Sequence, residues 1–417
     1  MIKAIRGTRD ILPPASTTWN FVERQVREVF RVFNYQEIRT PIFEETALFA
    51  RGVGAETDIV TKEMYTFADR DGESLTLRPE NTAGVVRAYL EHRLDQAPGV
   101  QKLFYLGPMF RRERPQKGRY RQFYQIGAEA IGVDSPVLDA EMIELCAMIF
   151  DRCGITGWKL YVNSVGDAES RAAYIEALRS ALAGVKDQLS EDNQRRADTN
   201  PLRVLDSKDP KDEPVIAALP NIHDFLNESC RRHFAAVCQY LDDRGIAYEV
   251  RPRLVRGLDY YTHTTFEFVH EGALGAQNSI CGGGRYNGLA ESIGSKFAAP
   301  GVGFSIGEDR LVMTVEETAA GRVPAHRIDL YMAPLGEEEF RHCSTLAQEL
   351  RNHGTVVELA APAKVKRAME LANKLGARYA LLVGENERNA GVYGLKNLES
   401  GEQVNLDRTA LIAHFSN

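Results

Sequence analysis

Apolar residues near the amino terminus recur at a helical spacing. In residues 17–33 they lie three to four positions apart, which predicts a long amphipathic helix. The apolar positions are Phe21 or Val22, Val26, Val29 or Phe30, and Phe33. The next stretch, YQEIRTPIFEE, has the pattern of extended chain and contains Pro41, so we expect a strand after the helix.

Strand-like patterns occur in two groups along the next 270 residues. The first group covers residues 76–78, 103–111, 119–131 and 159–165, and the second covers residues 248–250, 262–269, 278–281 and 301–305. Regular alternation of strand and helix is missing from this part, which favours an antiparallel sheet. Helices predicted over residues 82–92 and 139–153 should flank that sheet.

A polar, proline-punctuated stretch separates the two groups of strands. It contains LSEDNQRRADTNPLRVLDSKDPKDEPVIAAL, with helical patterns on either side, and predicts a mostly helical insertion at about residues 170–245. After AAGRVPAHR, apolar strands alternate with amphipathic helices that start near Glu337 and Lys364. We therefore expect one domain over residues 1–320, which contains the insertion, and a small α/β domain over residues 326–417.

Composition narrows the class of protein. The 417 residues are 44% hydrophobic and 26% charged, which is typical of globular proteins with two or three domains. No stretch has the roughly 20 apolar residues of a membrane helix, and the first residues lack a signal-peptide pattern, so we expect a cytoplasmic protein. Six scattered cysteines and nine histidines form no metal-ligand spacing, and neither disulfides nor a metal site is predicted.

Positive charge is concentrated in one segment, although the formal net charge is -7. The sequence FRRERPQKGRYRQFYQ, residues 110–125, carries six basic residues and one glutamate, which indicates a local polyanionic partner such as a nucleotide. A solvated hairpin with a charged edge that discourages sheet pairing is the structural alternative.

Strand periodicity sorts the side chains of this hairpin. One face should carry Arg121, Phe123, Gln125, Gly127 and Glu129, and the other Tyr120, Gln122, Tyr124, Ile126 and Ala128. Arg111 and Glu113 share a face on the preceding strand. The first face thus offers a cation, an aromatic plate, a gap at Gly127 and an acid in linear order, which suits a nucleotide joined to a small amine substrate.

Two further segments combine polar groups with the start of a regular element. In TLRPENTAGVVRAY, helix capping would explain Asn81 or Thr82 but would leave Glu80 free. In LVRGLDYYTHTTFEF, Arg256 precedes a glycine. We expect the adjacent Tyr260 and Tyr261 to point to opposite faces, one into the core and one into a pocket.

Two glycine-containing segments complete the set of motifs. SICGGGRYNGL lacks the G-K-[ST] ending of a phosphate loop, so we interpret it as a glycine strand that a ligand approaches closely. PGVGFSIGEDRL predicts a strand that leads into a helix with Arg310 in its first turn, where a phosphate would be favoured.

Together these segments resemble the histidyl-tRNA synthetases, a class II aminoacyl-tRNA synthetase family, over essentially the whole chain. Residues 17–41 resemble motif 1, which builds the dimer interface in that family. FRRERPQKGRYRQF is similar to motif 2 and GVGFSIGEDR to motif 3. LVRGLDYYT and CGGGRYNGL resemble the two histidine-specific motifs, and RPENTAG resembles the segment that holds the substrate amino group.

The resemblance implies an α+β fold: a class II antiparallel sheet flanked by helices, a helical insertion, and a C-terminal anticodon-binding α/β domain. The implied activity uses ATP and Mg2+ to convert L-histidine into histidyl-adenylate and pyrophosphate. The histidyl group is then transferred to the 3′ end of histidine tRNA. The implied protein is a cytoplasmic homodimer, joined through the motif 1-like helix and strand, that does not enter a membrane.

The resemblance also implies residue roles. Arg111 would hold the α-phosphate, Glu113 the adenine edge and Phe123 the adenine face, while Arg121 and Arg310 would hold the outer phosphates. Catalysis would depend on Arg256 and Arg111, with Arg256 approaching the α-phosphate from the side opposite Arg111. Histidine would be bound by Glu80, Asn81, Thr82, Arg111, Gln125, Glu129, Arg256, Tyr260 and Tyr261. Within that set, Glu80 and Thr82 would take the α-ammonium, and Glu129 and Tyr261 the imidazole.

Other positions are peripheral to this site or depart from the family pattern. Arg114 and Gln116 in the hairpin turn would touch the first base pair of the tRNA acceptor stem. Glu308 stands where leucine is frequent in the family and Asp309 where glutamate is frequent, so neither is assigned a role.

Two other functions compete with this interpretation. One is a non-catalytic relative, such as the regulatory subunit of ATP phosphoribosyltransferase; the intact LVRGLDYY and the ATP arginines oppose it. The other is a plain RNA-binding module, which would need dispersed basic residues. From Ala325 onwards the chain has 11 Lys and Arg against 12 Asp and Glu, so recognition of RNA there should use shape and base contacts.

Overall fold

The computed structural model describes residues 2–55, 57–207, 209–254, 257–272, 278–325 and 327–416. The chain divides into two compact units, Met1–Val323 and Pro324–Asn417. Each unit has hydrophobic cores of its own and is described by itself.

An eight-stranded sheet forms the centre of the first unit, in the order β1-β5-β6-β11-β10-β9-β7-β8. Its strands are β1 (Gln36–Glu37), β5 (Gln101–Phe110), β6 (Gln122–Ile131), β7 (Trp158–Ser164), β8 (Glu249–Val250), β9 (Thr262–His270), β10 (Ser279–Arg285) and β11 (Gly301–Gly307). The pairs from β5 to β7 are antiparallel, while the two-residue edge strands β1 and β8 pair in parallel with β5 and β7. The α+β class and the largely antiparallel sheet flanked by helices are therefore confirmed.

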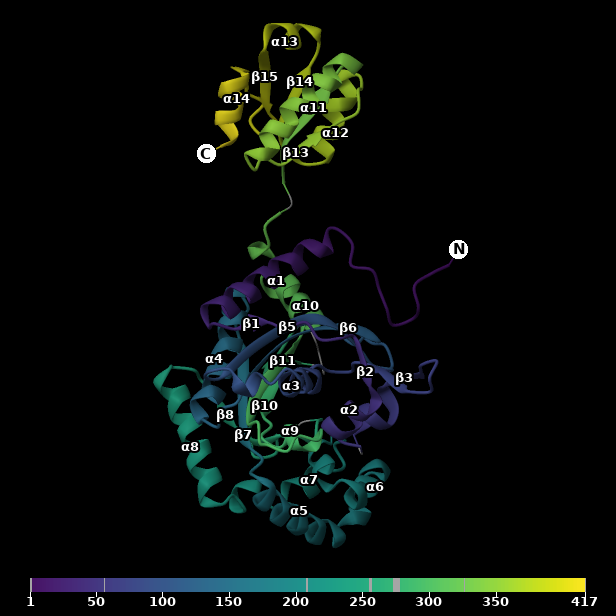
Figure 1. Ribbon diagram of the computed structural model, residues 1–417, viewed down its shortest axis with the longest axis vertical. Helices are drawn as coiled ribbons and strands as arrows, with labels where there is room; N and C mark the ends of the chain where they lie inside the picture. The colour runs from purple at the N-terminus through teal and green to yellow at the C-terminus, as the bar shows by residue number, and fades with distance from the viewer. Residues whose placement is uncertain are drawn as a thin grey trace. The chain divides into compact units, whose positions relative to one another are not determined.

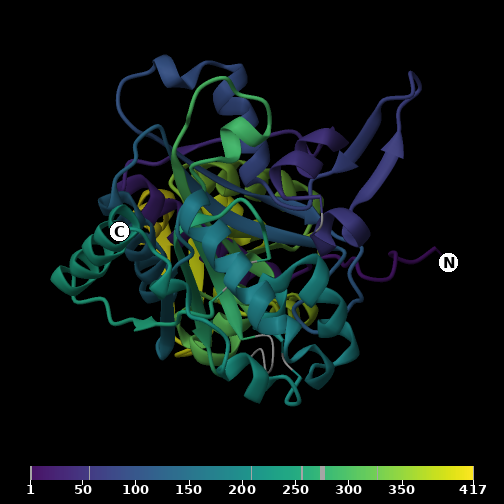
Figure 2. The same ribbon diagram turned by 90° about the horizontal axis from the view of Figure 1, so that it is seen from below.

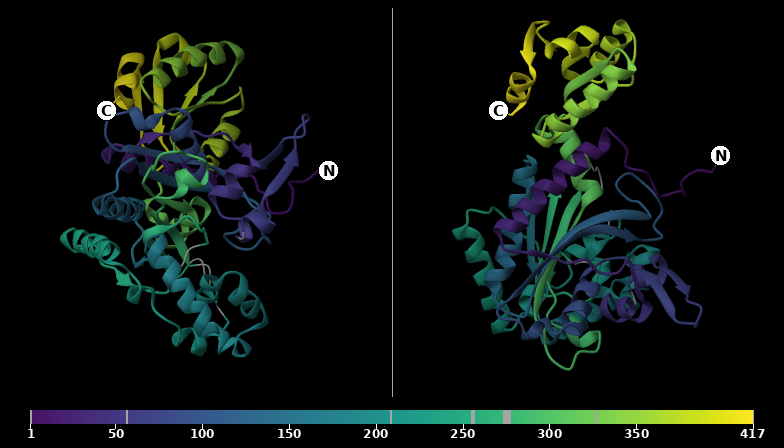
Figure 3. Two further views of the ribbon diagram at one scale, coloured as in Figure 1. Left: turned by 60° about the horizontal axis from the view of Figure 1, so that its bottom comes forward. Right: turned by 45° about the horizontal axis from the view of Figure 1, so that its top comes forward.

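Helices cover one face of this sheet (Figures 1 and 3). They are α1 (Ala15–Val32), α4 (Pro136–Cys153), α8 (Glu228–Asp243) and α10 (Glu308–Thr318). Proline at the first position of α4 and Gly154 at its end, with φ of 81°, fix the bounds of that helix. Ile126 and Ala128 of β6 lie in this core, as the period-two pattern predicts, so the opposite face of β6 is left for a site.

A small sheet, in the order β2-β4-β3, lies outside the large one. Its strands are β2 (Phe43–Glu45), β3 (Tyr65–Ala68) and β4 (Ser74–Leu77), and α2 (Thr46–Gly52), α3 (Thr82–Glu91) and α9 (Leu289–Ser292) pack nearby. The expectation that residues 76–78 continue the main sheet is wrong, because β4 pairs instead with its neighbours in sequence. The β3–β4 hairpin projects from the body of the unit (Figure 2).

The helices between β7 and β8 are α5 (Ala168–Ala183), α6 (Glu191–Thr199), α7 (Glu213–Ala217) and α8. The first three lie away from α1 and α10 (Figures 1 and 3), whereas α8 packs against α4. Asp167 accepts a hydrogen bond from the backbone N–H of Ser170, and Asn227 accepts one from that of Cys230, so both α5 and α8 have side-chain caps. A hydrophobic cluster that includes Tyr174 packs inside this group of helices.

The second unit is built on a five-stranded mixed sheet in the order β13-β12-β14-β15-β16. The strands are β12 (Ile328–Pro334), β13 (Val357–Leu359), β14 (Ala377–Val383), β15 (Val392–Asn397) and β16 (Gln403–Asp407). The helices are α11 (Glu337–Asn352), α12 (Val365–Lys374), α13 (Glu385–Ala390) and α14 (Arg408–Phe415). This arrangement is a small α/β domain with hydrophobic clusters on both faces of its sheet.

Candidate active site

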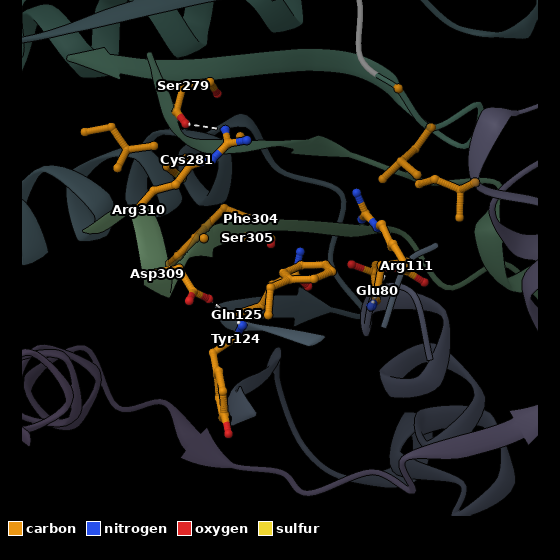
Figure 4. Close-up of a pocket in the computed structure, with 18 of the residues that line it drawn as sticks. Glu80, Arg111, Tyr124, Gln125, Ser279, Cys281, Phe304, Ser305, Asp309 and Arg310 are labelled. Atoms are coloured by element: carbon orange, nitrogen blue, oxygen red, sulfur yellow. Dashed lines mark hydrogen bonds between the residues drawn. The ribbon is translucent and has the colours of Figure 1, made fainter. Parts of the chain in front are cut away.

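A cavity of about 240 Å3 lies on the face of the large sheet opposite α1 and α4. The hairpin β5–β6, strands β10 and β11 and the start of α10 contribute to it, together with residues near 80 and 260. The expected site residues that line it are Glu80, Thr82, Arg111, Glu113, Phe123, Gln125, Tyr260, Tyr261 and Arg310. Figure 4 shows part of this set. Arg256 lies outside the described residues.

Arg111 is held at one side of the cavity at the end of β5. Its Nε donates a hydrogen bond to the Pro79 carbonyl at 2.8 Å, and its guanidinium carbon lies 5.2 Å from the centre of the Phe123 ring. The Glu113 carboxylate forms an ion pair with Arg119 at 3.2 Å and lies 3.8 Å from Arg111. This side of the cavity therefore combines the guanidinium groups of Arg111 and Arg119, the Glu113 carboxylate and the Phe123 ring.

Arg310 lies at the other side of the cavity (Figure 4). Strand β11 leads directly into α10, so Arg310 falls in the first turn of that helix. Its Nη1 donates to the Ser279 carbonyl at 2.8 Å and its Nε to the Gly118 carbonyl at 3.3 Å. Burial lowers the pKa of Arg310, but a guanidinium keeps its proton at neutral pH. An anion in the cavity thus has fixed positive charge on two sides.

Glu80 caps α3 as well as lining the cavity. Its carboxylate accepts the backbone N–H groups of Thr82 at 2.8 Å and Ala83 at 3.0 Å. The interpretation that capping would leave Glu80 free is therefore wrong, since its side chain caps the N–H groups of the two residues that begin α3. Asn81, at the usual cap position, makes no capping bond. Burial raises the pKa of Glu80, and the two backbone donors oppose that rise.

Glu129 lies directly behind the lining of the cavity. Its carboxylate accepts hydrogen bonds from the Thr82 hydroxyl at 2.8 Å and from the Tyr286 hydroxyl at 2.6 Å. Both of these partners line the cavity, whereas Glu129 is fully buried. Burial raises its pKa to about 8. Its carboxylate occupies the space above Gly303, where a Cβ would lie 1.8 Å from Oε2.

The gap at Gly127 is filled by the protein itself. Tyr105 stands opposite Gly127 in the register of β5 and β6, and a Cβ at Gly127 would lie 2.3 Å from the Tyr105 hydroxyl. The expectation that this gap admits a ligand is therefore wrong. Tyr105 itself lines the cavity, and its buried hydroxyl has no hydrogen-bond partner among the described residues. The sequence did not predict a role for Tyr105, because its place beside Gly127 depends on the register of β5 on β6.

Tyr260 and Tyr261 both line the cavity, with ring centres 4.7 Å apart. Tyr261 is buried, as expected for one of the pair, and Tyr260 is partly buried; both face the cavity because β9 begins only at Thr262, so the strand alternation that would separate them does not yet apply. In the glycine strand β10, Gly282 lines the cavity. At Gly283, however, the protein backbone takes the place of the expected ligand. A Cβ there would lie 2.4 Å from the Gly303 carbonyl oxygen.

Other expected residues lie outside the cavity lining. The Asn81 side chain accepts a hydrogen bond from the Thr40 hydroxyl at 2.6 Å, and Arg121 packs against Gly7. Arg114 and Gln116 are exposed in the hairpin turn. Two residues without an expected role, Arg119 and Asp309, do line the cavity.

Asp309 ties the start of α10 to β6. One carboxylate oxygen accepts the Tyr124 backbone N–H at 2.9 Å, shown in Figure 4, and the other accepts Arg9 at 2.7 Å. Glu308 is buried, and its Oε1 lacks a hydrogen-bond partner among the described residues. Burial, with Glu23 and Asp309 nearby, holds the pKa of Glu308 well above its usual range.

Within the described ranges, no three His, Cys, Asp or Glu side chains come together as metal ligands. None of the helices described above is long and apolar enough to cross a membrane.

Comparison with known proteins matches both units. Residues 7–311 match the family model described as histidyl-tRNA synthetase, and residues 329–417 match the model described as anticodon binding domain. The chain is 65% identical to the histidine–tRNA ligase of Solibacter usitatus over 100% of this chain and 99% of the relative. It is 55% identical to the histidine–tRNA ligase of Koribacter versatilis over 100% of this chain and 96% of the relative.

A solved structure covers the same length. The crystal structure of apo histidyl-tRNA synthetase from S. aureus matches with a TM-score of 0.83 at 39% sequence identity, over 100% of both chains. The similarity in sequence and in fold therefore extends over both units of the chain.

Proposed function

Since this chain belongs to the histidyl-tRNA synthetase family, and so is a histidine–tRNA ligase, we propose that ATP and histidine meet in the cavity beside β6. The observation that carries this proposal is the pair of partly buried guanidinium groups, Arg111 and Arg310, on opposite sides of the cavity. A bent triphosphate between them would receive charge-assisted hydrogen bonds from both sides. The high identity to true ligases disfavours a non-catalytic regulatory subunit.

The ATP end of the site lies along the β5–β6 hairpin. We assign Arg111 to the α-phosphate, Phe123 to the adenine face and Glu113 to the adenine edge. Arg310 would hold the outer phosphates. Arg121 was the expected second arginine there, but Arg119 is the one that lines the cavity, so we propose that Arg119 shares this role.

Mg2+ would enter this site together with ATP. It is usually held by substrate phosphates, water and one or two carboxylates rather than by a protein cage. The carboxylates of Glu113 and Asp309 line the cavity, but Asp309 already accepts Tyr124 and Arg9 and Glu113 is assigned to the adenine edge, so phosphates and water would supply most of the Mg2+ ligands. When bound, Mg2+ would neutralise charge on the phosphates.

The histidine end of the site contains acceptors that lack a partner. Gln125 Oε1 is buried without a hydrogen bond among the described residues, and it lies in the cavity with Glu80 and Thr82. Leaving such an acceptor unpaired costs about 1–3 kcal/mol, so an α-ammonium group that donates to it would be stabilised. We assign the ammonium to Glu80, Thr82 and Gln125.

The imidazole is assigned to Glu129 and Tyr261. Binding would require the imidazole to reach past Thr82 and Tyr286, whose hydroxyls now occupy the Glu129 carboxylate. Rotation of either hydroxyl would free an acceptor for a ring N–H. Asn81 would support this end of the site from behind through its bond with Thr40.

The first chemical step joins the two ends of the site. A carboxylate oxygen of histidine attacks the α-phosphorus, a new P–O bond forms, and pyrophosphate leaves with the electrons of the broken bond. Arg111 would stabilise the negative charge that develops on the α-phosphate. Arg256 has the same role in our proposal, on the basis of family resemblance. The adenylate then loses AMP when the 3′ hydroxyl of the tRNA attacks the histidyl carbonyl.

Recognition of tRNA would involve one surface in each unit. Arg114 and Gln116, exposed at the tip of the hairpin, would contact the acceptor stem. The second unit would bind the anticodon, since residues 329–417 match an anticodon-binding model.

We also propose a homodimer, joined through α1 and the strands that follow it. Phe43 on β2 and Phe67 on β3 are about half exposed, at 53% and 46%, and their ring centres are 6.5 Å apart. Such a pair of exposed aromatic rings suits a protein interface. A Phe43→Asp variant that keeps the mass of the wild type in analytical ultracentrifugation would count against this interface. We expect the enzyme to act in the cytoplasm.

Histidine-dependent exchange of pyrophosphate into ATP tests the proposed site. Wild-type protein should catalyse exchange, and Arg111→Ala should lose about 100- to 1000-fold in kcat/KM. Arg112→Ala is the matched control, since that neighbouring arginine is exposed and lies outside the cavity lining. Equal effects of the two substitutions would refute the assignment, and absence of exchange in the wild type would favour a non-catalytic relative.

A further inference from the structure

We propose that Gly7 and Arg9 are positioning residues that hold the ATP end of the site in register. The inference rests on the proposed function, because it assumes that ATP binds between the β5–β6 hairpin and α10. Neither residue lines the cavity, yet both contact the elements that carry its arginines.

Arg9 bridges three parts of the fold. Its Nη2 donates to Asp309 at the start of α10 at 2.7 Å, and its Nη1 donates to the Tyr120 hydroxyl at 3.0 Å. Its guanidinium carbon also lies 4.3 Å from the centre of the Tyr120 ring. The planar guanidinium of Arg9 therefore joins the residues just before β6 to the first turn of α10. Arg9 and Asp309 are 300 residues apart in the sequence.

Asp309 transmits this contact to the site. Its second carboxylate oxygen accepts the Tyr124 backbone N–H at 2.9 Å, and the residue that follows it in α10 is Arg310. The Asp309 side chain is 5% exposed, whereas that of Arg9 is 36% exposed. A buried carboxylate with two donors fixes the distance between β6 and α10, and with it the distance between Phe123 and Arg310.

Gly7 holds the residues just before β6 by a different contact. Its carbonyl accepts the Arg121 backbone N–H at 2.7 Å, and its φ is 93°, a conformation that favours glycine. A Cβ on Gly7 would lie 2.7 Å from Arg121 Cγ and 3.0 Å from Pro115 Cγ. Any other residue here would push the base of the hairpin away from the segment that carries Arg9.

Variants of Arg9 in the full-length protein test the proposal by exchange kinetics. Arg9→Ala should raise the KM for ATP by about tenfold or more, because small displacements of positioned groups have effects of that size. The KM for histidine should stay within about twofold, because Glu80, Thr82 and Gln125 lie outside these contacts. Arg9→Lys should restore part of the loss, since an ammonium can pair with Asp309 but cannot fork to Tyr120.

Arg6→Ala is the matched control, because Arg6 carries the same charge in the same segment and its side chain makes no hydrogen bond or ion pair among the described residues. It should leave both KM values unchanged. The double variant Arg9→Ala with Asp309→Asn should raise the KM for ATP no more than the more severe of the two single variants, because the two residues act through one contact.

Three outcomes would overturn the proposal: an unchanged KM for ATP in Arg9→Ala, an equal rise in both KM values, or multiplicative effects in the double variant. Arg9→Lys, which keeps the pairing with Asp309, provides the same readout if Arg9→Ala does not fold. Exchange activity of the wild type tests the proposed function separately, so the two ideas can fail independently.

Discussion

The substitution Glu129→Gln tests whether histidine is bound by an ionised carboxylate. Gln keeps the size of the side chain and can still pair with the Thr82 and Tyr286 hydroxyls, but it cannot ionise. In the free protein the pKa of Glu129 is raised to about 8 by burial, so about one molecule in ten is ionised at pH 7. If the imidazole donates to the carboxylate, binding draws on that fraction alone.

The expected size of the effect follows from this fraction. Between pH 7 and pH 9 the ionised fraction rises about tenfold, so the KM of the wild type for histidine should fall about tenfold relative to that of Glu129→Gln. At pH 9 the variant should need about 10- to 150-fold more histidine, which corresponds to about 1.5–3 kcal/mol for a charge-assisted hydrogen bond. Comparing the two proteins removes the titration of histidine itself, since both meet the same substrate.

The assay is pyrophosphate exchange at saturating ATP, with the KM for histidine measured at several pH values. A constant ratio of the two KM values from pH 7 to pH 9 would refute the reasoning.

Chemical unfolding gives an independent check. The folded protein keeps the proton to pH about 8, while the unfolded chain loses it near 4.5, so wild-type stability should fall as pH rises through that window, by up to roughly 5 kcal/mol. Glu129→Gln should lack this fall.

Three further experiments test other roles. Arg256→Ala should lower the pre-steady-state rate of adenylate formation by about 100- to 1000-fold while ATP and histidine still bind, and a normal rate would exclude the role. Arg119→Ala should raise the KM for ATP more than Arg121→Ala does, because Arg119 lines the cavity; the reverse order in exchange kinetics would return the phosphate role to Arg121. A chain ending at Val323 should retain histidine activation but lose most tRNA charging, and normal charging would show that the second unit has another task.

The local pattern of apolar residues was sufficient to predict those helices and strands that bury one continuous face. The spacing of apolar residues in α1 and the alternation in β6 predicted which side chains enter the core, because a helix and a strand each have a fixed period. The antiparallel sheet was predicted from the distribution of strand patterns along the chain, whereas the α+β class came from the family resemblance. Among the expected site residues, Phe123 and Gln125 follow from the alternation of β6, and Thr82 and Arg310 from the first turn of a helix; all four line the cavity, and their roles stay predictions.

Features that depend on contacts between distant segments could not be predicted. Tyr105 meets Gly127 only when the register of β5 on β6 is known, and Arg9 meets Asp309 across most of the catalytic unit. Glu80 was misinterpreted for a local reason. The usual cap position belongs to Asn81, and a glutamate one residue earlier caps the helix here because its longer side chain reaches the same N–H groups.

The contact between Tyr105 and Gly127 has a consequence for engineering the amino-acid specificity of this enzyme. A library that varies position 127 alone will return few folded variants, since even the methyl group of alanine would lie 2.3 Å from the Tyr105 ring. Removing the hydroxyl does not help, because Tyr105 Cζ is equally close. Positions 105 and 127 therefore form a single design unit: a larger residue on one strand requires a smaller one on the other. Their combined volume, rather than either side chain, sets the floor of the pocket offered to a new substrate.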